Sequence, residues 1–133
     1  MSGEHDLNIL LRSMSATSID GTFVFVTLPE REIPDGLSPR MVFQEAEGTT
    51  LILLKSEAEA HAMAYEFPSR MITLNVHSAL DAVGFIALIA TKLAAAGMGV
   101  NPVAGFFHDH LFIPEDRADD AIAILKQIAS DAV

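Results

Sequence analysis

The sequence predicts an α+β protein made of two related units, each with an antiparallel sheet that has its helices on one face. Three observations support this prediction. Short runs rich in β-branched and aromatic residues alternate with segments of helical periodicity. Two hairpin–helix segments, TLILLKSEAEAHAM at Thr50 and HLFIPEDRADDAIA at His110, align with each other. Half of the 133 residues are hydrophobic and 20% are charged, which is enough apolar material for a packed core.

The first stretch of the chain indicates a helix, a strand and a long loop. Asp6 is a candidate N-cap for a short amphipathic helix over residues 6–14, which we expect to cover the sheet of the first unit. Residues 15–20 are predicted to be a loop. The run GTFVFVTL, residues 21–28, is typical of a buried strand. Residues 29–39 contain three prolines and a glycine, and this composition predicts a loop.

A hairpin and a short helix follow. Residues 41–45 and 49–54 are predicted strands on either side of a tight turn at Glu47-Gly48. Ser56 and Glu59 have the spacing of a capping box, in which the serine side chain begins a helix and the acid bonds back to it.

The second half of the chain repeats this plan. Phe67-Pro68 is a predicted connector, and residues 71–76 (MITLNV) are a predicted strand. Ser78 and Asp81 have capping-box spacing before the most apolar helix of the chain, and Gly97 is a typical residue to end it.

The last elements are a hairpin and a helix. The runs at residues 103–107 and 111–113 are predicted strands around the polar segment His108-Asp109-His110. Pro114 and the acidic pair Glu115-Asp116 are typical of a helix start.

The two hairpin–helix segments are related residue by residue, with matched positions sixty residues apart as Leu51 and Leu111 are. The other matched pairs are Ser56 with Asp116, Ala58 with Ala118 and Glu59 with Asp119. We interpret this as a duplication of a strand–helix–strand–strand–helix unit, which is the ferredoxin-like plan. In the first copy the Pro-rich loop replaces the crossover helix. The predicted boundary divides the chain into residues 1–66 and 67–133.

The strands are apolar on both faces. Phe106 lies beside Phe107, and Leu53 beside Leu54, where a sheet with one face in water should alternate. We therefore expect the second face to be covered by the sister repeat or by another subunit.

Composition restricts the partners. The net charge of −10 argues against nucleic acid, because phosphate binding needs a basic surface. The chain has no cysteine, its first residues lack the basic start of a signal peptide, and no apolar run is long enough to cross a membrane. These features predict a soluble cytoplasmic protein with no membrane partner.

Two motifs flank the apolar helix: Ser78–Gly84 lies between the preceding strand and the helix, and Gly99-Val-Asn101 follows the helix. Through these motifs the segment 75–125 resembles the ACT family of small-molecule regulatory domains. The whole chain resembles a bacterial group of tandem ACT-like proteins of unassigned function, through Gly21–Phe25, Glu47–Ile52 and His108–Pro114. This group is similar to the CASTOR arginine sensors. The resemblance implies a protein without catalysis that binds an amino acid at the interface between two ACT units.

The resemblance also suggests ligand-contacting residues. In the arginine sensors an acidic residue at the equivalent strand start contacts the ligand, which points here to Asp109 and to its counterpart Thr49. A carboxylate at that place can hold an ammonium or a guanidinium group. The alternative is that Asp109 only makes the turn.

The start of the apolar helix is the second part of the predicted site. ACT ligands lie near this loop, and the free amides of a helix N-terminus suit a ligand carboxylate, so Ser78, Asp81, Val83 and Gly84 are candidates. The alternative is a capping box that binds no ligand.

His108 is a further candidate for ligand contact, and it also raises the question of a metal. His108 and His110 are spaced like two metal ligands on one strand, with His77 as a third residue, but no other ligand spacing supports a metal site. The chain has no phosphate-binding Gly-rich loop and no G-x-S-x-G motif. The sequence therefore predicts no catalytic residue, metal or cofactor, and metal-dependent hydrolysis is the weakest alternative.

Together these patterns predict a small regulatory or sensor protein that binds an amino acid or a related metabolite between ACT-like units. We expect it to form a homodimer. The alternative is a non-catalytic dimerisation or interaction module whose ligand site is degenerate.

Overall fold

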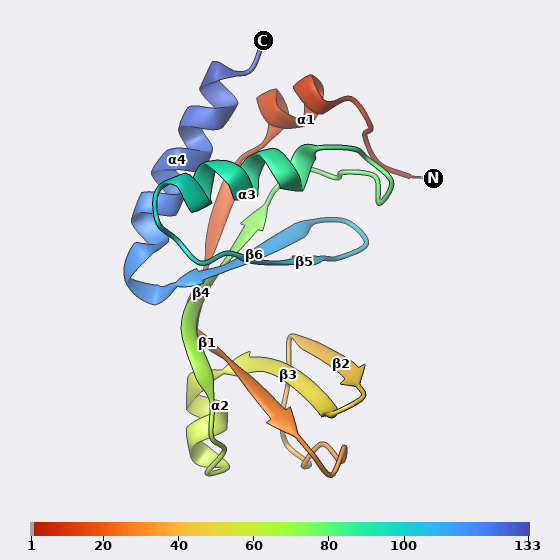
Figure 1. Cartoon of the computed structure of the whole chain (residues 1–133), viewed down its shortest axis with the longest axis vertical. Helices are drawn as coiled ribbons and strands as arrows, with labels where there is room; N and C mark the ends of the chain where they lie inside the picture. Colours follow the sequence, from red (N-terminus) through yellow and green to blue (C-terminus); the bar gives the residue numbers. More distant parts are fainter. Residues whose placement is uncertain (1) are drawn as a thin grey trace. The chain divides into compact units, whose positions relative to one another are not determined.

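In the computed structural model, strands β1 (Ala16–Leu28) and β4 (Glu66–Leu74) are the two longest strands (Figure 1). Each of them contributes residues to two compact units. The larger unit takes the chain up to Asp20 together with Arg70–Val133, and the smaller unit is Gly21–Ser69. The chain therefore passes from one unit to the other in the middle of a strand, and does so twice.

In the smaller unit a hairpin pairs with the second part of β1. The hairpin and the helix after it are β2 (Met41–Glu45), β3 (Gly48–Leu54) and α2 (Lys55–Ala60). Strand β3 lies between β2 and β1 and is antiparallel to both. Glu45 pairs with Gly48, so the turn is Ala46-Glu47, one residue before the predicted position.

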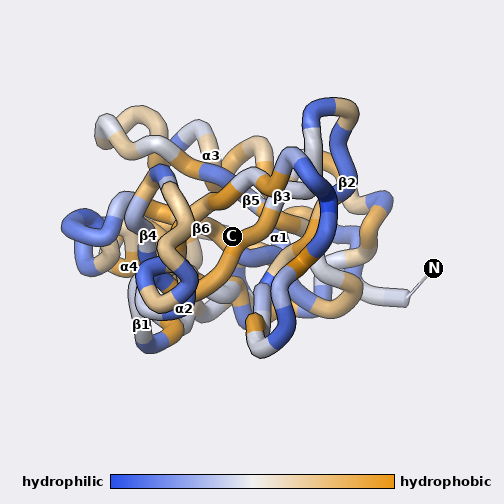
Figure 2. The backbone as a smooth tube through the Cα atoms, turned by 90° about the horizontal axis from the view of Figure 1, so that it is seen from below, coloured by the Kyte–Doolittle hydropathy of each residue, from blue (hydrophilic) through white to orange (hydrophobic). Residues whose placement is uncertain are grey.

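The core of the smaller unit comes from alternate residues of two strands. The buried side chains are Val24, Val26, Leu51, Leu53 and, from α2, Ala58. In Figure 2 the apolar end of β3 stands out in orange. The Pro-rich loop packs Leu37 against this cluster, and the backbone N–H of Ser38 donates to the Glu57 carboxylate at 2.8 Å. The loop thus takes the place of a crossover helix, as predicted.

The larger unit contains three helices. Its elements, besides parts of β1 and β4, are α1 (Leu7–Ser13), α3 (Phe85–Ala95), β5 (Asn101–Ala104), β6 (Asp109–Pro114), a 3-10 turn (Glu115–Arg117) and α4 (Ala118–Asp131). The strand order continues from β1 through β4 and β6 to β5, so the complete order is β2-β3-β1-β4-β6-β5. The predicted α+β class with antiparallel strands and ferredoxin-like repeats is confirmed.

Helices α1, α3 and α4 lie on one side of β4, β6 and β5 (Figure 1). Their apolar stripes meet the strands in one cluster of buried side chains, which includes Leu10 of α1, Ile89 and Leu93 of α3, and Leu125 of α4. Fully burying one such side chain contributes about 1.5–3 kcal/mol. This packing corrects the expectation that α1 covers the first repeat, because α1 instead completes the helical layer of the larger unit.

The sixty-residue relation is visible in the packing. Leu51 on β3 and Leu111 on β6 are both completely buried, and Ala58 and Ala118 are both buried on the helix that follows. The duplicated hairpin–helix segments therefore have equivalent positions in their own units.

The predicted capping boxes are wrong. Helix α2 begins at Lys55 after Leu54, and α4 follows Arg117, and neither has a side-chain cap. Helix α3 begins at Phe85, later than predicted, because Gly84 enters it with φ of +95°, a conformation that glycine adopts without strain. Ser78 lies too far upstream to cap α3. In α1, by contrast, Asp6 does cap the helix, accepting from the Ile9 N–H at 3.0 Å.

Two predicted connections belong to strands. Residues 16–20 extend β1, and Phe67-Pro68 lies in β4. Proline is tolerated near the start of a strand, where it removes few hydrogen bonds of the sheet. The predicted strand at residues 103–107 ends at Ala104, because the tip of the β5–β6 hairpin is wider than expected.

Several strand residues are buried although they belong to neither apolar cluster. Phe23 and Ile52 have no exposed surface, and Phe112 is 2% exposed, so the chain by itself covers these side chains. The structure describes residues 2–133, and none of the helices in that range is both long enough and apolar enough to cross a membrane.

Candidate functional site

Asp109 is the first residue of β6, and its carboxylate is buried, with 8% of the residue exposed. It faces the connection between β4 and α3, residues 75–84, which we call the site loop. Ser78 of the site loop donates its hydroxyl to Oδ2 of Asp109 at 3.0 Å. Within residues 2–133 the structure gives Oδ1 of this carboxylate no hydrogen bond. An oxygen of a largely buried carboxylate attracts a cation or a charged hydrogen-bond donor that comes within reach.

A pocket of about 340 Å³ lies beside this pair. Its walls come from the site loop, the first turn of α3 and the β5–β6 hairpin: Ser78, Ala79, Leu80, Ala82, Gly84, Phe85, Ile86, Ala87, Pro102, Ala104 and Asp109. Asp109 is the single charged residue among them. The pocket therefore combines apolar walls with one negative charge, the composition of a small-molecule site.

The N-terminus of α3 provides the opposite electrostatic character. The first intrahelical bond runs from the Leu88 N–H to the Gly84 carbonyl, so the amides of the preceding three residues have no partner within the helix. No side chain caps this end. The positive end of the helix dipole favours a negative group there. Because the same residues line the pocket, it offers groups for both ends of a zwitterion.

Three of the predicted ligand residues meet in this pocket, and four do not line it. Ser78, Gly84 and Asp109 are lining residues. The carboxylate of Asp81 is exposed and pairs with the His5 ring at 2.7 Å. The side chain of Val83 is 85% exposed.

His108 and Thr49 also lie elsewhere. The His108 carbonyl accepts from the Gly105 N–H at 2.9 Å and closes the hairpin tip. Nδ1 of its neighbour His110 lies 3.0 Å from the Thr73 hydroxyl. Within the described part of the chain, no three His, Asp or Glu side chains are grouped to hold a metal ion.

Thr49 occupies in the smaller unit the position that Asp109 has in the larger one. It is fully buried, and its hydroxyl lies 2.8 Å from Oε1 of Gln44 and 3.4 Å from the Arg31 carbonyl. The Arg31 side chain donates to the Ala46 carbonyl at 2.8 Å. The polar groups around Thr49 thus satisfy one another.

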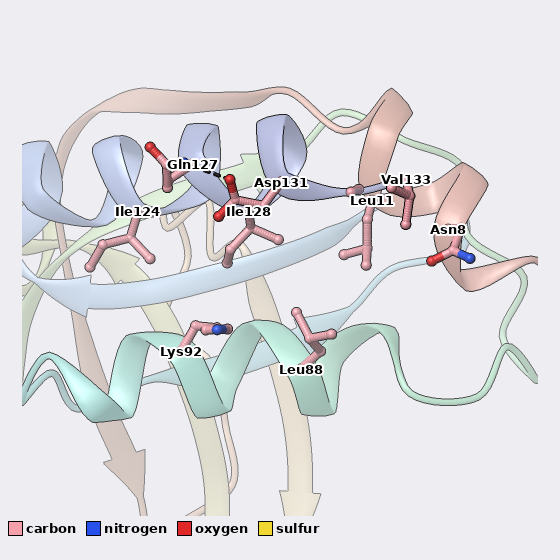
Figure 3. A pocket seen from close by; sticks show the side chains of 10 residues that line it. Asn8, Leu11, Leu88, Lys92, Ile124, Gln127, Ile128, Asp131 and Val133 are labelled. Carbon is pink, nitrogen blue, oxygen red and sulfur yellow. Dashed lines mark hydrogen bonds between the residues drawn. The ribbon is translucent and has the colours of Figure 1, made fainter.

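A second pocket of about 340 Å³ lies between α1, α3 and α4. Figure 3 shows Leu88 and Lys92 of α3 pointing toward α4, and Ile128 of α4 pointing toward α3. Its polar residues do not converge on one point: Gln127 donates to Asp131 on its own helix at 2.7 Å, and Lys92 is exposed. We place recognition at Asp109, where a buried charge and helix amides share one pocket.

Sequence reasoning missed the segment that packs against the site loop. Residues 3–5 run beside it, with a parallel bridge between Glu4 and Ser78. These residues are polar and show no hydrophobic periodicity, so the sequence does not predict a regular structure for them. The apolar wall from Pro102 and Ala104 was also missed, since a hairpin strand does not reveal which loop it faces.

The chain matches the sequence models of known domains over almost its full length. One model of the ACT domain matches residues 2–70, and a second matches residues 66–127. No curated protein matches the chain.

Solved structures show the same fold. A Vibrio cholerae protein of unknown function, described as a possible transport protein, is 37% identical; the match covers 92% of this chain and 95% of that one, with a TM-score of 0.82. An Agrobacterium tumefaciens protein is 17% identical over 87% of this chain and 89% of its own, with a TM-score of 0.73. The regulatory subunit of aspartate kinase from Thermus thermophilus is 13% identical over 85% and 95%, with a TM-score of 0.63. The chain therefore belongs to the ACT domain family and carries two ACT domains in tandem.

Proposed function

We propose that this protein is a regulatory protein that binds an α-amino acid, or a metabolite of the same charge pattern, in the pocket at Asp109. The observation that supports this most is the buried Asp109 carboxylate in an apolar pocket that also contains the uncapped start of α3. The membership in the ACT family supports it too, as does the fold shared with aspartate kinase regulatory subunits.

The chemistry of recognition follows from these groups. The ligand ammonium binds the free oxygen of Asp109, and a hydrogen bond of this charged kind contributes about 1.5–3 kcal/mol. The ligand carboxylate binds the first amides of α3 and gains about 0.3–1 kcal/mol from the helix dipole. Leu80, Phe85 and Ile86 offer apolar contacts to the side chain. We therefore expect aliphatic amino acids to bind better than acidic ones.

The proposed mechanism is differential stabilisation and includes no catalytic step. A ligand that binds one arrangement of the site loop and α3 more tightly than another shifts the population toward it. A partner that recognises this arrangement then responds to the ligand concentration. We keep the sequence-based hypothesis that a second ACT-like unit closes the open side of the pocket.

The test is a titration of the common amino acids, with L-leucine as the first probe, by thermal shift and calorimetry. A ligand at one hundred times its Kd should stabilise the fold by about 2.7 kcal/mol. We expect L-leucine to raise the melting temperature of the wild type and to have little effect on Asp109→Asn. If no amino acid stabilises the wild type at millimolar concentration, the proposal is wrong.

One observation favours the alternative function, a dimerisation module with a degenerate site. Phe106 and Phe107 at the hairpin tip are 62% and 59% exposed, and their rings pack on each other with centroids 5.0 Å apart. Exposed apolar groups of this kind often mark protein interfaces. Light scattering that finds a dimer, together with no response to amino acids, would support this function. Loss of the dimer in Phe106→Ser would locate its interface.

A further inference from the structure

We infer that the N-terminal segment Gly3–Leu7 is a strap that holds the site loop in its binding shape, so that this segment is a positioning element of the ligand site. Its effect on affinity rests on the proposed function, whereas its effect on the order of the site loop does not. Four successive contacts connect the strap to the loop.

The first contacts are backbone hydrogen bonds on both sides of Ser78. The Glu4 N–H donates to the His77 carbonyl at 2.9 Å, and the Ala79 N–H donates to the Glu4 carbonyl at 2.9 Å. Glu4 thus forms an isolated parallel bridge with Ser78. Because Ser78 itself donates to Asp109, the strap fixes the backbone of the residue that orients the recognition carboxylate.

Gly3 makes the close approach possible. It has φ of +98°, and a Cβ built on it would lie 2.7 Å from the Ala79 nitrogen and 2.9 Å from the Ala79 Cα. These are backbone atoms, which cannot move aside as a flexible side chain could. A larger residue at position 3 therefore cannot occupy the strap without displacing the site loop.

Two further contacts continue toward the start of α3. Nε2 of His5 lies 2.7 Å from Oδ1 of Asp81. The Leu7 side chain lies 3.6 Å from the point where a Cβ of Gly84 would be, so it packs against the residue that begins α3. The strap thus follows the site loop from His77 to Gly84, and both Ala79 and Gly84 line the pocket.

Apart from the strap, two kinds of contact hold this section: the Ser78 hydroxyl donates to Asp109, and the His77 ring packs against the rings of Phe106 and Phe107. The other backbone hydrogen bonds that the middle residues of the site loop donate are short-range, from the Ser78 N–H to the Val76 carbonyl and from the Ala82 N–H to the Ala79 carbonyl. Ordering each residue of a chain costs about 1–2 kcal/mol. A strap that orders the loop before binding lowers the cost that the ligand must otherwise offset.

The decisive experiment compares Gly3→Ala with Gly36→Ala in the full chain. Gly36 also has a positive φ, of +88°, but open space surrounds its Cβ position, so this control reproduces the backbone strain without the clash. Hydrogen exchange at the Ala79 amide measures, without any ligand, whether the strap still protects the site loop. Calorimetry with L-leucine measures the affinity of the site. A variant lacking residues 2–5 provides a second way to remove the strap, and the amides of Ile89 and Leu93 show whether the core remains folded.

We expect Gly3→Ala and the deletion to exchange the Ala79 amide at least about tenfold faster and to bind L-leucine at least about tenfold more weakly, since tenfold corresponds to one hydrogen bond of typical strength. Gly36→Ala should change neither measurement. If Gly3→Ala and the deletion leave the exchange rate of the Ala79 amide unchanged, the strap does not order the site loop and the inference is wrong. Faster exchange with unchanged L-leucine affinity would overturn its role in the site. If the wild type does not bind L-leucine, the proposed function has failed for that ligand, and the exchange at Ala79 alone decides whether the strap orders the loop.

Discussion

Two connections differ between the units: residues 29–40 connect β1 with β2 in the smaller unit, and residues 75–100 connect β4 with β5 in the larger unit. In the larger unit the connection contains α3, which buries Ile89 and Leu93 in the core. In the smaller unit it is a loop that adds one apolar side chain, Leu37, to the cluster. A helix has an apolar face that covers the sheet and a set of unpaired amides at its start. An irregular loop of this length has no continuous apolar face and no such set of amides.

The polar residues near the start of β3 and at the start of β6 also differ between the two units. Among residues 2–133, one carboxylate oxygen of Asp109 has no hydrogen-bond partner beside the pocket, whereas the Thr49 hydroxyl lies between Gln44 and the Arg31 carbonyl. Arg31 of the loop contacts Thr49 through its carbonyl, and Ser78 of the site loop contacts Asp109 through its hydroxyl. The two duplicated positions therefore differ: Asp109 has a polar group available to a ligand, whereas the hydroxyl of Thr49 already has partners within its own unit.

The largest expected effect tests the covering role of α3. Ile89→Ala should lower the free energy of unfolding by about 3 kcal/mol, because it removes a fully buried side chain and leaves a cavity. Leu37→Ala should cost only about 1 kcal/mol, since this side chain is half-buried. Urea unfolding of both variants measures the difference. Equal losses would mean that the loop contributes as much to its core as the helix does.

The next effect concerns the open carboxylate. Asp109→Asn keeps the shape and the acceptor for Ser78 but removes the charge, so the affinity for L-leucine should fall at least about tenfold while stability changes little. Asp116→Asn makes the same change of charge on an exposed residue and is the matched control. Calorimetry on the two variants should separate them, and equal affinities would remove Asp109 from the site.

The smallest effect tests the closed position of the smaller unit. Thr49→Val leaves Gln44 and the Arg31 carbonyl without their shared hydroxyl, which should cost about 1 kcal/mol of stability. Affinity for L-leucine should not change. The exposed Thr27 provides the control, since Thr27→Val removes a hydroxyl that water already solvates. A loss of binding in Thr49→Val would show that the smaller unit takes part in recognition.

The sequence was sufficient for the elements whose signals are local. Asp6 caps α1, the β2–β3 hairpin forms within one residue of its predicted turn, and Gly97 follows α3 with φ of +81°. The hydrophobic pattern and the sixty-residue relation predicted the fold class because the core positions of both units repeat.

The site could be predicted only in part, because its remaining features depend on contacts distant in sequence. Ser78 and Asp81 have the spacing of a helix cap, but Asp109 uses the Ser78 hydroxyl and His5 uses the Asp81 carboxylate. Local propensity cannot show that the side chain bonds instead to a partner 31 or 76 residues away. The late start of α3 coincides with Gly84, which precedes the helix with φ of +95°.

The division of β1 and β4 between the units has a consequence for any attempt to split the protein. A cut at the predicted boundary after residue 66 gives two fragments, and neither contains all the strands of either unit. The first fragment has α1 without α3 and α4, so that Leu10 and Leu11 lose their apolar surroundings. Each fragment then has apolar surface that the other fragment covers in the intact protein. We therefore expect the mixed fragments to reassociate as a non-covalent complex. Such a pair could report complementation in a cell.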